Sequence, residues 1–312
     1  MSSTLIAVVL ALVLGHYVTA LARLRCFGWF TRWRGWLGRR MGTSFASPFA
    51  LLAVLVPPLA LVAWAQDAAA GHFHGLAGFA FALAMLVYCW GPRDLDLDVE
   101  AAEEADDAAA RTLALARLSG SDRPAGEDPE SLMRAVFRGA RRRWFGVLFW
   151  FLLLGPFGAL LYRLAERTVD HSGQAAPPPA QAAAWRHLLA ILDWPVAHLM
   201  TLALAVVGHF DAVYGAWRDW HAANEGGGFD FSAGFLDAAA RVSVGLALHD
   251  AEAERREDDD ADDAASADAR EHQPPADAPA PTPVLHASMA LVWRILVAWL
   301  VVLALFVLAG YV

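Results

Sequence analysis

The stretch RRRWFGVLFWFLLLGPFGALLYRLAER, residues 141–167, decides how this chain folds. It begins with three arginines and a tryptophan, and residues 144–162 then carry no charge for 19 positions. A helix that crosses a bilayer needs about 20 mostly apolar residues, and arginine beside tryptophan is typical of a membrane surface. We therefore expect residues 144–162 to enter a membrane, with the arginines at its edge.

The centre of this stretch reads Gly155-Pro156-Phe157-Gly158. Proline removes a helical hydrogen bond, and glycine weakens a helix through its conformational freedom. Two interpretations follow: a single span with a kink, or the tip of a re-entrant hairpin. The hairpin would keep residues 163–187 on the cytoplasmic side.

Apolar residues also gather elsewhere in the chain. The whole sequence is 57% hydrophobic and 18% charged, against about 45–50% and about 25% for a soluble domain. We predict an all-α, polytopic membrane protein with four to six spans and additional amphipathic cytoplasmic helices. The candidate stretches are 1–22, 41–66, 68–92, 144–162, 187–210 and 295–312.

Two of these stretches need comment. Residues 1–22 have no basic residue before Leu5, which favours a retained helix over a cleaved signal peptide. In the fifth stretch, Asp193 and Pro195 flank Trp194, and this pattern predicts a helix that starts at Trp194 with Asp193 as its cap. The remainder of that stretch is either a short span or a helix at the membrane interface.

Arginine placement predicts the orientation, because cytoplasmic loops are enriched in basic residues. Residues 23–40 hold six arginines and residues 91–143 hold nine, whereas the turn 66–75 holds none. We expect the two basic segments in the cytoplasm and the turn outside. The multi-pass arrangement follows from this alternation.

The second basic segment is expected to form amphipathic helices. From Leu95 to Ala116, apolar residues recur every three or four positions with acids between them, which predicts one helix with a solvated acidic face. Gly120 then closes this helix. Asp128 is expected to cap a second helix that ends in the run Arg141-Arg142-Arg143-Trp144.

Composition also suggests the domain organisation. Residues 1–250 are predicted to form one membrane-embedded helical domain. Residues 251–283 are rich in acids, alanine and proline and lack large apolar side chains, so we predict a disordered linker. Residues 284–312 are predicted to form a C-terminal transmembrane helix that packs on the same domain, with Arg294 at the edge of its apolar part.

Several chemistries are excluded by composition. All 24 basic residues are arginine, which removes P-loop and Schiff-base sites that need lysine. Cys26 and Cys89 lack metal-site spacing, and the two histidines at 72–74 have no acid or thiol beside them. The glycine-rich residues 224–234 predict a loop. We expect no cofactor, no metal and no nucleic-acid partner.

Ionisable residues gather where the apolar stretch 144–162 ends. Glu166 follows Arg163 by three positions, so the two can pair on a helix, and Arg167 can pair in the same way with Asp170 or His171. Ionisable residues in membrane proteins are functional candidates by default. This cluster is therefore a candidate site.

Neighbouring segments contribute further candidates. Arginine's planar guanidinium suits phosphate and carboxylate, so we predict a cavity that binds an anionic small molecule. His198 and His209 could face Asp193, or could pack and form interfacial hydrogen bonds. The predicted ligand-binding residues are Arg141, Arg142, Arg143, Arg163, Glu166, Arg167, Asp170 and Asp193.

Two blocks of the sequence resemble a known family. They are residues 141–167, quoted above, and LLAILDWPVAHLMTLALAVVGHFDAVYGAW at 188–217. Together with the order of apolar stretches, they are similar to the AmpE family of inner-membrane proteins from Gram-negative bacteria. That family is described as modulating AmpC β-lactamase induction and is encoded beside the cytoplasmic amidase AmpD. The likeness extends over about residues 1–250 and the last helix.

A more distant resemblance connects the chain with the CobD/CbiB adenosylcobinamide-phosphate synthases, through residues 93–105 and 149–163. That family carries an acidic motif before its Phe-Trp block, but residues 137–143 here contain four arginines and no carboxylate. An acid-dependent site for Mg²⁺ or an amine would not work with this reversed charge.

These resemblances imply a regulatory protein of the bacterial inner membrane, linked to β-lactamase induction and cell-wall recycling and not catalytic. Its expected partners are the lipid bilayer, an AmpD-type amidase and an anionic small molecule. The alternative is a membrane enzyme related to the synthase, with an altered site. A plain membrane scaffold that binds a cytoplasmic partner through residues 91–143 is a third interpretation.

Overall fold

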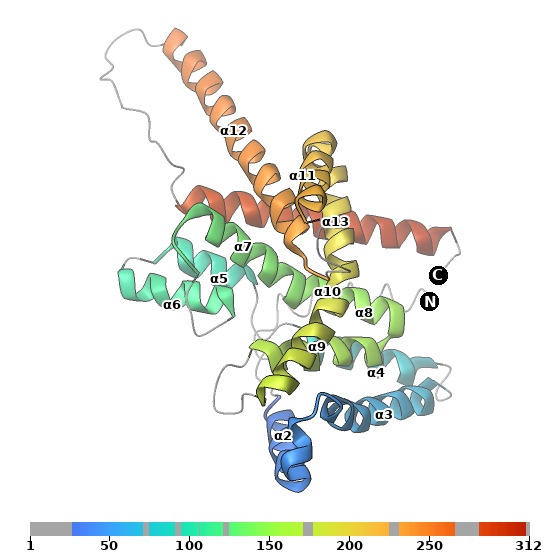
Figure 1. Cartoon of the computed structure of the whole chain (residues 1–312). Coiled ribbons are helices and arrows are strands. Elements are labelled where there is room, and N and C mark those ends of the chain that lie inside the picture. The colour runs from blue at the N-terminus through green and yellow to red at the C-terminus, as the bar shows by residue number, and fades with distance from the viewer. Residues whose placement is uncertain are drawn as a thin grey trace.

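The computed structural model of the chain is shown in Figure 1. At residues 70, 170, 257–265, 281 and 307 it describes the backbone alone. The predicted first span, Cys26 and the histidine pair at 72–74 lie outside the described residues. The described ranges are 27–70, 75–90, 95–105, 107–120, 125–170, 177–224, 231–265 and 281–309.

Every regular element in these ranges is helical, which confirms the all-α prediction. α7, η4 and α8 follow one another without a break, and η4 is a single π-helical turn. The helices are α2 (Gly28–Met41), η2 (Gly42–Ala46), α3 (Ala50–Ala70), α4 (Leu76–Cys89), α5 (Leu95–Glu103), α6 (Ala108–Ser119), α7 (Pro129–Ala140), η4 (Arg141–Phe145), α8 (Gly146–Leu154), α9 (Pro156–Asp170), α10 (Pro179–Val207), α11 (Phe210–Ala223), α12 (Gly234–Ala265) and α13 (Pro281–Leu308).

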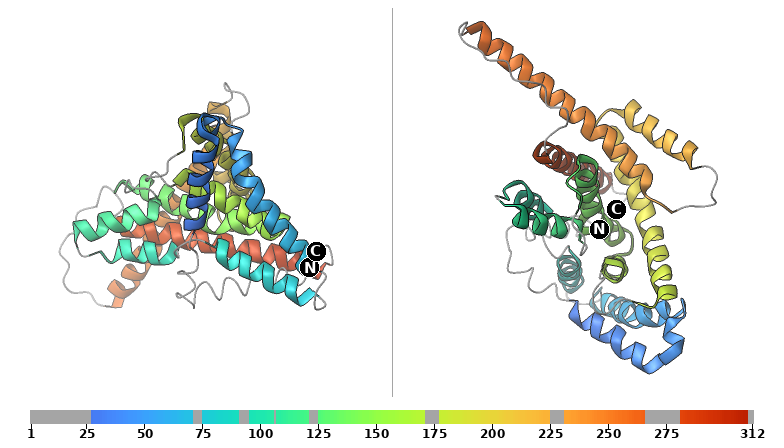
Figure 2. Two further views of the ribbon diagram at one scale, coloured as in Figure 1. Left: turned by 90° about the horizontal axis from the view of Figure 1, so that it is seen from below. Right: turned by 60° about the vertical axis from the view of Figure 1, so that its left-hand side comes forward.

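Three of the described helices are long and apolar enough to cross a membrane. They are α3, α10 and α13, over residues 50–69, 179–207 and 282–306. Figures 1 and 2 show α10 running across the directions of α3 and α13 instead of alongside them. The structure therefore indicates a membrane protein, although its long apolar helices do not form a bundle of parallel spans.

Residues 144–162 form a helical hairpin. α8 ends at Gly155, whose φ of 67° reverses the chain, and α9 then packs along α8. A Cβ atom at Gly158 would lie 2.1 Å from the carbonyl oxygen of Trp150, and one at Gly146 would lie 2.1 Å from the ring of Tyr162. Only glycine permits such close approach. Of the two alternatives, the structure shows the hairpin and not the kinked single helix.

The predicted helix start at Trp194 is wrong. α10 begins 15 residues earlier, at Pro179, and continues through Pro195, which lies inside the helix. An internal proline disturbs the helical hydrogen bonds of the preceding turn, and the carbonyl of Leu192 in that turn accepts a hydrogen bond from Trp150 Nε1 at 3.1 Å. Asp193 is not a cap; it is buried among other helices.

The predicted helix from Leu95 to Ala116 is two helices. α5 ends at Glu103 and α6 begins at Ala108, and the Asp107 side chain caps α6 by accepting from the backbone N–H of Ala110. The break changes the phase of the apolar face. Leu113, expected inside, is therefore 52% exposed. Buried residues on α6 are Ala114, Leu115 and Leu118.

The end of α6 and the start of α7 agree with the sequence. Gly120 ends α6 with a φ of 65°, a left-handed conformation that suits glycine. Asp128 caps α7, and its Oδ2 accepts from the backbone N–H of Ser131 at 2.9 Å. A hydrogen bond from the Ser131 side chain, together with this backbone hydrogen bond, lowers the pKa of the exposed Asp128 carboxyl below its ordinary value.

The predicted linker at 251–283 is too long. α12 continues to Ala265 and α13 begins at Pro281, so the stretch that remains between them, 266–280, lies outside the described residues. Alanine, glutamate and arginine are good helix formers, and adding residues to an existing helix is easier than starting one. α12 therefore continues past residue 250, although the residues there lack large apolar side chains. Arg294 lies in the middle of α13.

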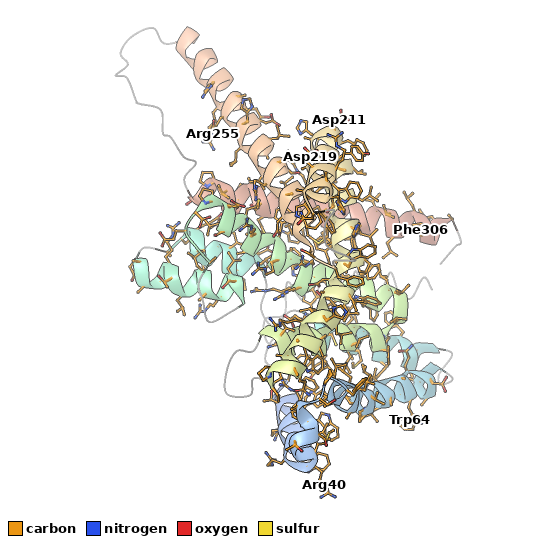
Figure 3. All side chains as sticks on the ribbon, in the orientation of Figure 1. Arg40, Trp64, Asp211, Asp219, Arg255 and Phe306 are labelled. Atoms are coloured by element: carbon orange, nitrogen blue, oxygen red, sulfur yellow. The ribbon has the colours of Figure 1, made fainter. Side chains whose placement is uncertain are left out.

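Apolar side chains are divided between an interior and an exposed surface. The first half of α13 packs on α7 and α5 and buries Leu285, Val292 and Ile295. Its second half exposes large apolar residues, as do α3 and the tip of α8. Figure 3 shows Trp64 of α3 and Phe306 of α13 toward the same side of the molecule. An exposed apolar surface of this kind suits contact with lipid.

Candidate functional site

A group of buried charges lies where α5, η4, α9 and α10 meet. The π turn η4 supplies Arg141 and Arg143, and α9 supplies Arg163 and Glu166. Asp193 comes from α10. All five are less than 9% exposed. Isolated π turns are frequent at functional sites, and this one carries the arginine run identified in the sequence.

Asp193 is held from two sides. Its Oδ2 lies 3.4 Å from Nη2 of Arg141, and its Oδ1 accepts a hydrogen bond of 2.7 Å from the hydroxyl of Tyr162. Tyr162 is fully buried. A buried carboxylate needs both charge and hydrogen-bond compensation, and Asp193 has both. Arg141 Nε has no hydrogen-bond partner among the described residues.

Arg143 joins η4 to the amphipathic helices. Its Nη1 lies 2.5 Å from Oδ2 of Asp98, and its Nη2 donates to the carbonyl oxygen of Arg117 at 2.7 Å. Asp98 is 1% exposed. The sequence assigned Asp98 to a solvated acidic face, and this assignment is wrong. It shares the buried face of α5 with Leu95 and Ala102, three positions before it and four after, and this spacing was the signal that could have identified it.

Arg163 is enclosed completely, with 0% exposure. Its Nη1 donates to Glu166 Oε2 at 2.9 Å, which confirms the predicted pair, and its Nε donates to the carbonyl oxygen of Cys89 at 2.7 Å. Cys89 is the last residue of α4, where helix carbonyls lack helical donors and carry partial negative charge. Arg163 therefore caps α4 while it neutralises Glu166.

The remaining candidates lie around this centre. Arg142 and Arg167 are partly buried, and the guanidinium of Arg167 lies 5.2 Å from the centre of the Phe27 ring. Burial alone would raise the pKa of Glu166, which follows the apolar stretch, but the charges of Arg163, Arg167 and Arg142 lower it. The side chain of Asp170 and the residue after it are outside the described set, so their predicted pairing with Arg167 is not tested.

A second, more exposed set of charges connects α7 with α12. Glu130 contacts both Arg134 and Arg241, and Asp237 lies 3.9 Å from Arg134. Burial raises the pKa of the Asp237 carboxyl, although neighbouring arginines including Arg141 oppose the shift. The sequence did not identify this set.

The two histidines do not join Asp193. His198 Nδ1 lies 2.9 Å from the carbonyl oxygen of Trp194, and its ring packs against Trp194 and Phe235. His209 follows the end of α10 and is exposed. Packing and local hydrogen bonding, the second of the two interpretations, describes His198.

The chemistry available at the centre is limited by these pairs. Three carboxylates, Asp98, Glu166 and Asp193, each face an arginine at 2.5–3.4 Å. In the described part of the chain, no three His, Cys, Asp or Glu side chains are grouped closely enough to hold a metal ion. An anion could approach the centre through the partly buried Arg142 and Arg167, so the predicted anion site stays a prediction.

Comparisons with known proteins give no relative. No protein-family model, curated protein or solved structure matches the chain. The resemblance to AmpE therefore depends on the two sequence blocks and the order of the apolar stretches.

Proposed function

We propose that this chain is a non-catalytic regulatory protein of the bacterial inner membrane, of the AmpE type, acting in AmpC β-lactamase induction and cell-wall recycling. The observation that carries the proposal is the internal pairing of the central carboxylates. Asp98 and Asp193 face Arg143 and Arg141, and Glu166 faces Arg163. A synthase site needs carboxylates available for Mg²⁺ or for an amine.

The proposed input is an anionic small molecule at the edge of this centre. Arg142 and Arg167 are the two arginines of the set that solvent reaches most easily. Guanidinium groups form strong paired hydrogen bonds with phosphate and carboxylate. Binding there adds negative charge beside Glu166, whose pKa already responds to both arginines.

The proposed output is the cytoplasmic surface formed by α5, α6 and α7. α7 runs through η4 into α8, so the surface and the apolar hairpin share one continuous helical segment. A π turn that converts to an α turn would change the register of α7 against α8. In this proposal, an AmpD-type amidase binds the α5–α7 surface in one of the two arrangements.

The test is β-lactamase induction in cells that lack the gene. After exposure to an inducing β-lactam, AmpC activity is expected to differ from that of the parent, and the wild-type chain is expected to restore it. Arg142→Ala combined with Arg167→Ala is expected to fail, whereas Arg218→Ala, at an exposed arginine of α11, restores induction. Unchanged induction after deletion would refute the regulatory role.

Ligand binding is tested on the purified full chain by thermal shift with nucleotides and anhydro-muropeptides. A stabilising anion is expected, with the shift lost in the Arg142/Arg167 double variant and kept in Arg218→Ala. A flat response across these compounds removes the small-molecule input. The alternative enzyme makes a separate prediction, since it would restore corrinoid synthesis in a strain without CobD/CbiB, and such rescue would overturn the non-catalytic assignment.

A further inference from the structure

An apolar groove of about 580 Å³ lies between α2, α3 and α4, on the side of the molecule away from α12. Trp29 and Trp33 of α2 form one wall, and Pro57 with Pro58 of α3 forms another. Tyr88 of α4 contributes to a third side. The groove is separate from the charged centre, and its lining is almost entirely apolar or aromatic.

The polar atoms of the groove walls are already engaged. Pro58 has no N–H to offer the carbonyl of Val54, four residues before it, and Trp33 Nε1 donates to that carbonyl at 3.1 Å. Trp29 Nε1 donates to the hydroxyl of Tyr88 at 2.7 Å. These hydrogen bonds hold the aromatic rings in place and leave carbon surface toward the groove. Its occupant should therefore be a hydrocarbon chain.

Positive charge lies on the helix that supplies Trp29 and Trp33 to this hydrocarbon surface. α2 carries four arginines and no acidic residue. Arg40 lies on the helix face of Trp29 and Trp33, because 11 residues make about three turns. Arg39 and Arg40 are exposed, and Figure 3 shows Arg40 at the outer end of α2. Trp36 stacks on Trp33 with 5.3 Å between ring centres.

We propose that this groove binds one acyl chain of an anionic phospholipid, whose phosphate contacts the exposed arginines of α2. Tryptophan and arginine together are typical of the headgroup level of a bilayer, and basic residues beside the membrane attract anionic lipids. A free anion would use the arginines without the groove. A zwitterionic lipid would use the groove without a preference for charge. Because this surface has both an apolar groove and exposed arginines, we infer an anionic lipid as the occupant.

The experiment measures lipid binding to the purified full chain by native mass spectrometry in detergent. Phosphatidylglycerol and phosphatidylcholine with identical acyl chains are compared. The wild-type chain is expected to prefer phosphatidylglycerol. The double change Arg39→Gln and Arg40→Gln is expected to weaken phosphatidylglycerol binding about 25-fold, since each arginine near the surface is worth about fivefold, and to leave phosphatidylcholine binding unchanged. Arg218→Gln on α11 is the matched control and keeps the preference.

A second variant tests the groove itself. Leu61 is 63% exposed and lines the groove, so Leu61→Trp fills it without disturbing the core. Binding of both lipids is expected to fall. The control is Leu202→Trp at a similarly exposed position on α10, which changes neither. No lipid preference in the wild type, an unchanged preference in the double arginine variant, or full binding in Leu61→Trp would each overturn the proposal.

Experiments on the same chain also test two other kinds of occupant, a soluble anion and a protein segment. If glycerol phosphate, which has no acyl chain, displaces phosphatidylglycerol at low millimolar concentration, a soluble anion is the ligand and the proposal is wrong. A photoreactive residue at position 61 is expected to cross-link to lipid in membranes. Cross-links to residues 5–22 of the same chain, or to a second copy, would instead show that protein fills the groove.

Discussion

Two arginine-rich regions of this molecule look alike in sequence but differ in how their arginines are paired and buried. The run Arg141–Arg143 and helix α2 both combine arginine with tryptophan at the edge of an apolar stretch. Arg141 and Arg143 are buried against carboxylates from other helices, whereas Arg39 and Arg40 are exposed. The difference teaches that the acids supplied by distant segments decide whether an arginine run becomes part of the interior.

The largest effect is expected when the central pairing is broken. Asp193→Ala leaves Arg141 buried without its carboxylate and removes the short hydrogen bond that the Tyr162 hydroxyl donates. Breaking a buried pair in this way costs about 3–5 kcal/mol. Thermal unfolding in detergent measures the loss. Asp211→Ala on the exposed first turn of α11 is the control, and an equal small change in both variants would show that the centre is not structural.

The hairpin that positions Tyr162 is the next point to test. Gly146→Ala places a methyl group into the Tyr162 ring, and overpacking of this kind costs about 1–3 kcal/mol. Gly245→Ala, on α12 with nothing near its Cβ position, should instead be neutral or slightly stabilising. If both alanines are tolerated equally, the close contact between α8 and α9 is not present in solution.

A smaller loss of stability is expected when a tryptophan that donates a hydrogen bond to a backbone carbonyl is replaced. Both carbonyls concerned lie in the helical turn before a proline. Trp150→Phe removes the donor to Leu192 near the centre, and Trp33→Phe removes the donor to Val54 beside α2. Each change is expected to reduce the free energy of unfolding by about 1 kcal/mol. Unfolding curves of the two variants, measured under the same conditions, compare the two losses in free energy of unfolding. A loss in one region alone would show that only that hydrogen bond matters.

The smallest effect on stability is expected at the exposed arginines. Arg39→Gln together with Arg40→Gln should change the free energy of unfolding by less than about 0.5 kcal/mol, as is usual for surface substitutions. The same measurement on Arg143→Gln is expected to show a loss of several kcal/mol, because Asp98 is then buried without its partner. Equal losses would contradict the contrast between the two regions.

Sequence reasoning succeeded where the deciding partners are close in the chain. The cap of α7 by Asp128, the end of α6 at Gly120 and the pair of Arg163 with Glu166 all involve residues within four positions. The helical class follows from composition and periodicity in the same way. Each of these features depends on local geometry that the sequence shows directly.

Sequence reasoning failed where the interacting residue is distant in the chain. Asp193 has the local pattern of a helix cap, but Tyr162 and Arg141, 31 and 52 positions away, place it inside α10. Asp98 has the composition of a solvated face, but Arg143 lies 45 positions further on. Local propensity is a weak prior that tertiary contacts override, and both errors have this cause.

The cap that Arg163 forms on α4 has a consequence for the order in which the chain assembles. Burying an arginine without its hydrogen-bond acceptors is costly, so the end of α4 is expected to be in position before α9 packs against it. Synthesis from the N-terminus provides this order. A circularly permuted gene that makes α9 before α4 is therefore expected to yield misassembled protein that membrane proteases remove.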